Sequence, residues 1–165
     1  MILYHGSMVV VEVPRIIPRM DGRGADFGIG FYTTSSHEQA VRWVHIRQQN
    51  LQEKTIGFVS CYETPDNLLS RPEVQTRSFK NASRAWLRFV RDNRNNPSFN
   101  HSYDIVKGPV ANDRVYATLS LWEEGFLDED ETIRRLKTFK LVDQILFHTD
   151  KSLSYLHFQK AEAIQ

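Results

Sequence analysis

The sequence predicts one α+β domain that covers residues 1–165. The chain is 41% apolar and 25% charged, as expected of a globular domain with a sizeable core. Strand-like and helix-like segments follow one another irregularly, without the strict alternation of a parallel α/β fold. The sequence contains no internal repeat and no low-complexity linker that would divide it.

Five strands are expected from short runs rich in apolar and β-branched residues. They cover residues 2–5, 29–34, 56–62, 103–107 and 144–149. The third run contains the one cysteine of the chain, Cys61. A cysteine in such a strand is expected to be a buried small hydrophobe rather than a nucleophile. A single cysteine also excludes an intramolecular disulfide and a cysteine-rich zinc site.

Three longer helices are expected, each on a different signal. The first begins after a serine pair, where Ser36 and Gln39 have the spacing of a capping box. The second, near 81–92, has apolar residues at helical spacing. The third, near 129–140, is acidic at its front and basic at its back, which suits the helix dipole. Residues 150–156 are a candidate for a fourth, short helical turn.

Charge and composition exclude several classes of protein. The formal net charge is +1, so we expect no bulk attraction to nucleic acid or to a membrane surface. The segment 1–5 has no basic leader and no long apolar run, so we expect no secretory signal, no membrane span and a cytoplasmic location. The histidines show no metal-ligand spacing, so no metal site is expected.

The second helix carries a basic stripe opposite its apolar face. Its members are Lys80, Arg84, Arg88 and Arg91. The simpler interpretation is a solvated helix face. The alternative is a surface for nucleic acid or for an acidic protein partner.

Residues 26–40 read DFGIGFYTTSSHEQA, and known glycine motifs do not explain them. The Asp-Phe-Gly triplet lacks the other elements of a protein kinase. Gly30 is followed by two aromatic residues instead of the Lys-Ser/Thr that ends a phosphate-binding loop. The third glycine of a dinucleotide fingerprint is also missing. These glycines therefore need another explanation.

Three separate strand ends carry a histidine, a tyrosine and a polar residue, in that chain order. They are His5-Gly6-Ser7, Gly30-Phe31-Tyr32-Thr33 and Gln144. In this order the residues resemble the ADP-ribosyltransferases of the diphtheria-toxin and poly(ADP-ribose) polymerase branch. Within that branch the chain is most similar to a family of small bacterial domains of unknown function, often encoded beside an antitoxin-like partner. The resemblance implies two bent antiparallel sheets around an NAD cleft, with helices on the periphery.

The resemblance also implies a role for each residue toward NAD. His5 would bond a ribose hydroxyl of the adenosine half, and the Gly6 backbone would pair with the nicotinamide carboxamide. Tyr32 would stack on the nicotinamide ring, and Gly28 and Gly30 would let the chain turn beneath the ligand. The implied catalytic residues are His5, Tyr32 and Gln144, and the implied binding residues are Gly6, Ser7, Gly28, Gly30, Thr33, Gln39, Asn112 and Asp113.

Gln144 departs from the pattern of most transferases of this branch, which place a glutamate there. A carboxylate about 4 Å from a developing cation contributes ~4 kcal/mol at an effective dielectric near 20, or roughly a thousandfold in rate. An amide keeps the hydrogen bond without the charge. Asp104 or the pair Asn112-Asp113 could supply another carboxylate, whereas Asp143 should point to the opposite face of its strand.

Two functions from different classes follow from the resemblance. The first is an NAD-dependent mono-ADP-ribosyltransferase that modifies a macromolecule, protein or nucleic acid, and acts as the toxin of a bacterial toxin–antitoxin pair with a small antitoxin partner. Single transfer is expected because an amide at Gln144 cannot activate a ribose hydroxyl for chain growth. The second is a catalytically inactive module of the same fold that binds NAD or ADP-ribose.

Overall fold

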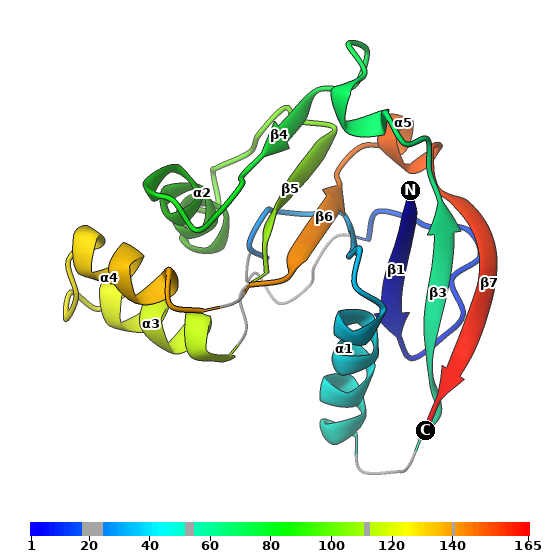
Figure 1. Ribbon diagram of the computed structural model, residues 1–165, viewed down its shortest axis with the longest axis horizontal. Helices are drawn as coiled ribbons and strands as arrows, with labels where there is room; N and C mark the ends of the chain where they lie inside the picture. Colours follow the sequence, from blue (N-terminus) through cyan, green and yellow to red (C-terminus); the bar gives the residue numbers. More distant parts are fainter. Residues whose placement is uncertain (18–24, 52–54, 111–112, 140) are drawn as a thin grey trace.

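The protein has an α+β fold, and its computed structural model describes residues 1–17, 25–51, 55–110, 113–139 and 141–165. In chain order the strands are β1 (Ile2–Ser7), β2 (Phe31–Thr33), β3 (Gly57–Glu63), β4 (Thr76–Ser78), β5 (Ile105–Pro109), β6 (Asp143–Phe147) and β7 (His157–Ile164). The helices are α1 (His37–Gln49), α2 (Arg84–Asn95), α3 (Asp113–Glu123), α4 (Glu129–Leu136) and α5 (Asp150–Leu153), with a 3₁₀ turn at Leu68–Ser70. The strands form two sheets, and α2, α3 and α4 gather on the side away from β1, β3 and β7 (Figure 1).

Sheet A has the strand order β1-β3-β7 and is antiparallel throughout. The β3–β7 register shifts between Cys61 and Tyr62, where an irregularity of this kind bends a strand and increases its twist. Cys61 itself is buried, as the sequence predicted, and burial raises the pKa of its thiol. Helix α1 covers one face of sheet A through Ala40 and Val44.

Sheet B has the strand order β2-β6-β5-β4, and it is mixed. Its first two pairings are antiparallel, but β4 runs parallel to β5. The prediction of two antiparallel sheets is therefore wrong at this edge. The physical reason is the connection: the chain leaves β4, passes through α2 and returns to β5, and parallel neighbours need such a crossover.

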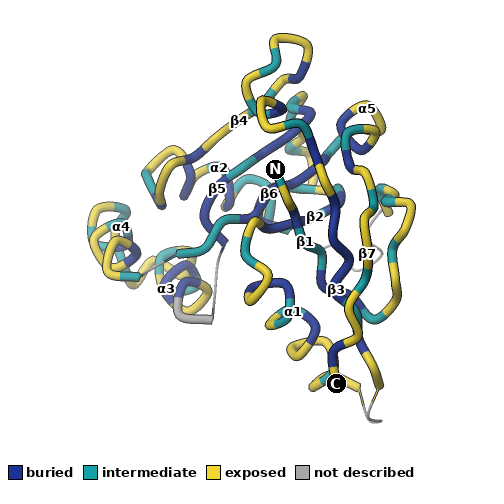
Figure 2. The backbone as a smooth tube through the Cα atoms, turned by 45° about the vertical axis from the view of Figure 1, so that its right-hand side comes forward, coloured by how far each residue is buried: buried dark blue, intermediate teal, exposed yellow. Residues whose placement is uncertain are grey.

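The two faces of sheet B are buried against different partners. One face packs on α2, α3 and α4 through large side chains that include Trp86 and Leu119. The other face meets sheet A, where Phe31 and Phe147 pack with Leu3. Figure 2 shows the resulting pattern, with β3, β5 and β6 largely buried and the helices exposed on their outer sides.

The expected helices form, with shifted ends. Ser36 caps α1, as predicted, by accepting a bond from the Gln39 N–H at 3.2 Å. The capping box is only half formed, because the Ser36 N–H bonds Thr34 Oγ1 at 3.1 Å. Helix α2 begins three residues later than predicted because Ser83 is its N-cap. Helix α4 ends at Leu136, four residues before the predicted end. Two strands, β4 and β7, and one helix, α3, were not predicted.

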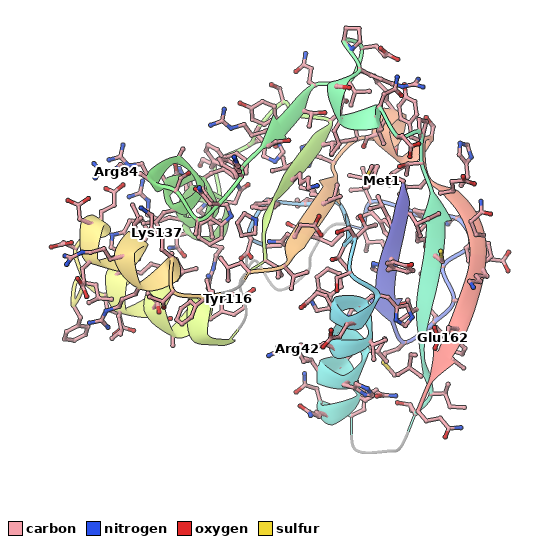
Figure 3. The ribbon with its side chains drawn as sticks, viewed as in Figure 1. Met1, Arg42, Arg84, Tyr116, Lys137 and Glu162 are labelled. Carbon is pink, nitrogen blue, oxygen red and sulfur yellow. The ribbon has the colours of Figure 1, made fainter. Side chains whose placement is uncertain are left out.

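The basic stripe of α2 lies against the acidic front of α4. Arg88 donates to both carboxylate oxygens of Glu129, at 3.0 and 3.1 Å, and Arg84 contacts Asp130. Hydrogen bonding from Arg88 lowers the pKa of Glu129. Arg84 and α4 are neighbours in Figure 3. Because these arginines are paired with α4, the stripe offers less positive charge to a nucleic-acid or acidic partner than the sequence suggested.

No helix in the described ranges is both long enough and apolar enough to span a membrane.

Candidate functional site

The candidate site begins where the two sheets touch. Tyr4 of β1 and Thr34, just after β2, exchange both backbone hydrogen bonds, each 2.9 Å long. This pairing is an isolated bridge and does not continue into a ladder. In a continued antiparallel ladder, Gly6 would come to lie opposite Tyr32. The predicted histidine, glycine and tyrosine therefore meet at the point where β1 and β2 stop pairing.

His5 reaches β2 at this point. Its Nδ1 lies 2.6 Å from the Tyr32 carbonyl oxygen, and its ring stacks on Phe31 with a centroid distance of 4.3 Å. Burial is the main cause that lowers the pKa of His5 to about 4, with a smaller contribution from the charge of Arg47, while the Tyr32 carbonyl acts in the opposite direction. The ring is thus neutral at pH 7. Because Nδ1 faces a carbonyl, it carries the hydrogen, and Nε2 is left as an acceptor.

Gly6 presents its backbone toward β2. The N–H and C=O of Tyr4 face the β2 side, where they bond Thr34, and not β3. Backbone groups two positions apart in a strand face the same side, so the N–H and C=O of Gly6 also face β2. The absence of a side chain at Gly6 also leaves space for α1. A Cβ built there would lie 2.1 Å from the Ala40 carbonyl oxygen. The glycine is therefore required for the close approach of α1, in addition to any approach by a ligand.

Tyr32 has its hydroxyl fixed by the loop that precedes β2. The hydroxyl accepts from the Phe27 N–H at 3.1 Å and donates to the Gly28 carbonyl at 2.7 Å. Its side chain packs against the core between sheet B and α2–α4. Since His5 stacks on Phe31, the next residue along β2, the His5 and Tyr32 side chains lie on opposite faces of that strand. The two are joined through the Tyr32 backbone.

We expect Tyr32→Phe to destabilise the protein by about 1–3 kcal/mol, because the buried Phe27 N–H and Gly28 carbonyl would lose their partner. Urea unfolding at pH 7 measures the change. Tyr4→Phe is the matched control, since its hydroxyl makes no hydrogen bond within the described residues. Equal stability of the two variants would contradict the anchoring role of the Tyr32 hydroxyl.

Gly28 and Gly30 are accounted for by the packing of the protein. Gly28 has a φ of +95°, and a Cβ there would lie 2.8 Å from Oδ1 of Asn93 in α2. At Gly30 a Cβ would lie 2.4 Å from the Phe147 carbonyl of β6. These glycines shape the loop that holds the Tyr32 hydroxyl. Their predicted place beneath NAD stays a prediction.

Gln144 lies near the start of β6, on the same face of sheet B as the Tyr32 side chain, since Tyr32 pairs with Leu146. It is only 4% exposed. Its Nε2 donates to Asp26 Oδ2 at 3.0 Å and lies 3.4 Å from the Pro109 carbonyl. Asp26, itself 5% exposed, was not among the predicted site residues. The sequence signal for it is a carboxylate beside the glycines of a loop, and that signal is shared with the Asp-Phe-Gly triplet of kinases.

The other carboxylates considered for the site point elsewhere. Asp143 accepts from Ser35 and Thr34 and faces Lys107 at 3.4 Å, so it turns away from the Gln144 side, as predicted. Asp104 receives bonds from Lys151, Thr149 and the Gln75 N–H. It precedes β5, whereas Gly108 pairs with Gln144, which separates the two by about 13 Å along the strand.

The remaining predicted binding residues have varied surroundings. Ser7 donates to the Val9 carbonyl at 2.5 Å, and Thr33 donates to the Ile145 carbonyl at 3.1 Å. Gln39 is buried in the first turn of α1. Asn112 lies outside the described residues, and Asp113 is the first residue of α3, a helix whose start is described for its backbone alone.

No group of three or more potential metal ligands occurs within the ranges that the structure describes. A cavity of about 470 Å³ opens on sheet B near the ends of β4, β5 and the start of β6. It is lined by Lys80, Lys107 and Asp143 together with apolar residues, and His5, Tyr32 and Gln144 are not among its lining residues. The cavity adjoins the candidate site at Pro109, whose carbonyl contacts Gln144, but those three residues do not line it.

Comparison with known proteins gives one match. A protein-family model described as "Protein of unknown function (DUF3990)" matches residues 1–158. No curated protein and no solved structure matches the chain. Because the family model covers nearly all of the sequence, the chain belongs to the DUF3990 family.

Proposed function

We propose that the protein is an NAD-dependent mono-ADP-ribosyltransferase with an ADP-ribosyltransferase-like fold, acting on a macromolecule. One observation carries the proposal: the His5 ring bonds the Tyr32 backbone carbonyl where the β1–β2 pairing ends, and the Gly6 backbone faces the same edge. A neutral His5 with Nε2 as acceptor suits a ribose hydroxyl donor. The N–H and C=O of Gly6 suit the C=O and NH₂ of a carboxamide.

The reaction exchanges one bond for another at the ribose. The bond from the ribose carbon to the nicotinamide nitrogen breaks, and nicotinamide leaves with the bonding electron pair. A nucleophilic nitrogen or oxygen of the acceptor bonds to the same carbon, and its proton passes to solvent. In this proposal His5 and Gly6 hold NAD, the Tyr32 carbonyl fixes the His5 ring, and Gln144 hydrogen-bonds the ribose beside the reacting carbon.

Transfer of one unit follows from the chemistry of Gln144. Growth of a polymer needs a base that activates a ribose hydroxyl of the previous unit, and an amide cannot take a proton at neutral pH. Asp104 is engaged by Lys151 and Thr149 and lies at the far end of β5. We further propose that the protein acts in the bacterial cytoplasm as a toxin and is neutralised by a small antitoxin partner.

A second candidate is a non-catalytic module that binds NAD or ADP-ribose. The observation that favours it is the state of Gln144, which is uncharged and 4% exposed. Such a residue offers little contact to a ribose in this conformation. It also has no charge to stabilise the cation that develops on the ribose as nicotinamide leaves.

The proposal is tested by nicotinamide release from NAD and by transfer of labelled ADP-ribose to a cell lysate. We expect the purified protein to release nicotinamide and to transfer ADP-ribose. His5→Ala should release nicotinamide at least about 100-fold more slowly, because it removes a binding contact and exposes Phe31. His45→Ala, an exposed histidine on α1, is the matched control and should retain activity. Protease and nuclease treatment of the labelled lysate identifies the class of acceptor.

Three outcomes would change the conclusion. Long polymer products would contradict single transfer. NAD binding without release or transfer would favour the non-catalytic module. A protein that neither binds nor cleaves NAD would exclude both candidates.

A further inference from the structure

A buried carboxylate lies beside the amide that stands in for the glutamate of related transferases. Asp26, in the loop before β2, and Gln144, near the start of β6, are 118 positions apart in the sequence and 3.0 Å apart at Oδ2 and Nε2. Both side chains are nearly inaccessible, at 5% and 4% exposed. A charged group so deeply buried is costly unless its partners are well placed, and Gln144 is one of the partners of Asp26.

The pair determines which way the Gln144 amide faces. Nε2 has two acceptors, Asp26 Oδ2 and the Pro109 carbonyl, the second at 3.4 Å. An amide whose NH₂ group meets two acceptors must turn its oxygen the other way. The oxygen of Gln144 is thus the atom left to accept a bond from a donor such as a ribose hydroxyl.

The loop that carries Asp26 is also held to Tyr32. The next residue, Phe27, donates its N–H to the Tyr32 hydroxyl at 3.1 Å. This loop therefore contacts two of the three residues assigned catalytic roles, Gln144 through Asp26 and Tyr32 through Phe27.

We infer that Asp26 is the positioning residue of Gln144 and supplies the negative charge that a glutamate at position 144 would otherwise carry. This inference rests on the proposed function. The pair then works as a unit: the amide makes the hydrogen bond to the ribose, and the carboxylate behind it polarises the amide and faces the positive charge that develops as nicotinamide leaves.

The inference reverses a simple expectation about Gln144→Glu. By resemblance to related transferases, a glutamate there should preserve or raise activity. With Asp26 in place, however, that substitution sets two buried carboxylates about 3 Å apart, and they cannot both ionise without a large cost. Gln144→Glu alone should therefore harm the protein, and Asp26→Asn should rescue it, because the double variant restores one amide and one carboxylate with their positions exchanged.

The experiment is a double-mutant cycle on the full chain with three readouts: melting temperature, NAD affinity by calorimetry, and nicotinamide release. Asp26→Asn should keep NAD affinity within about threefold and lower release at least about tenfold, since it removes charge and retains an acceptor for Gln144. Gln144→Glu should lower the melting temperature by about 5–10 °C. The double variant should regain at least half of the melting temperature lost in Gln144→Glu and most of the wild-type rate of nicotinamide release.

The outcomes separate this inference from the proposed function. If the wild type is active and Asp26→Asn releases nicotinamide at the wild-type rate, Asp26 has no positioning role. If the double variant melts no higher than Gln144→Glu, the two residues are not a unit. If the wild type neither binds NAD nor releases nicotinamide, the proposed function fails, and the assignment of Asp26 to it fails as well.

Discussion

Gly6→Ala is expected to destabilise the protein by about 3 kcal/mol or more and to lower its melting temperature by about 10 °C. The added Cβ would lie 2.1 Å from the Ala40 carbonyl oxygen, so α1 has to move away from β1. The contacting atom belongs to the backbone of a helix, so no side-chain rotation relieves the clash. The same displacement would disturb the start of α1 beside the candidate site, so NAD affinity should fall as well.

Gly125→Ala provides the comparison for this effect. A Cβ at Gly125 meets no atom within 4 Å, although its φ is +82°. Its cost should therefore be limited to backbone strain, about 1–2 kcal/mol, with NAD affinity unchanged. Thermal unfolding and calorimetry measure both quantities. If Gly6→Ala were no more costly than Gly125→Ala, the close approach of α1 to β1 would be wrong.

Acidification from pH 6.5 to pH 4 is expected to remove about 3 kcal/mol of stability through His5 alone. In the folded protein the pKa of His5 is lowered to about 4, whereas the unfolded chain has its ordinary value of 6.5. Above pH 6.5 the ring is neutral in both states, and the full stability is present. Below it the unfolded chain takes up a proton that the folded protein binds only near pH 4, so stability falls through this window.

His5→Gln should lose this pH dependence and keep a donor for the Tyr32 carbonyl. Urea unfolding at pH 7, 6 and 5 gives the slope for each variant. His45→Gln, on the exposed side of α1, is the control and should follow the wild type. Burial also lowers the pKa of His101, which contributes in the same direction, so the comparison must be made against the wild-type slope. An unchanged slope in His5→Gln would refute the burial of a neutral His5.

Local signals in the sequence were sufficient for part of the fold. The Ser36 cap, the buried Cys61 and the opposite orientation of Asp143 and Gln144 all follow from spacing within a few residues. The missed strands had no such signal. β4 is only three residues long, and most of β7 is exposed, so neither shows a clear apolar alternation.

The candidate site was predicted only in part, because only some of its residues have a local signal in the sequence. His5 and Tyr32 could be named because each occupies a recognisable strand end, and the structure brings His5 to the Tyr32 backbone. Asp26 could not be named, because its significance depends on Gln144, a residue 118 positions away. A loop carboxylate acquires a role only when the sheet has closed beside it, and short-range spacing contains no information on that closure.

The isolated bridge between Tyr4 and Thr34 has a consequence for how the protein opens. The β1–β2 backbone pairing between the two sheets consists of these two hydrogen bonds, whereas β1 and β3 pair over six residues. The amide hydrogens of Tyr4 and Thr34 are therefore sensors of sheet separation. In hydrogen exchange they would report any opening of this junction that leaves the β1–β3 ladder intact, and a ligand that spans the junction would slow their exchange selectively.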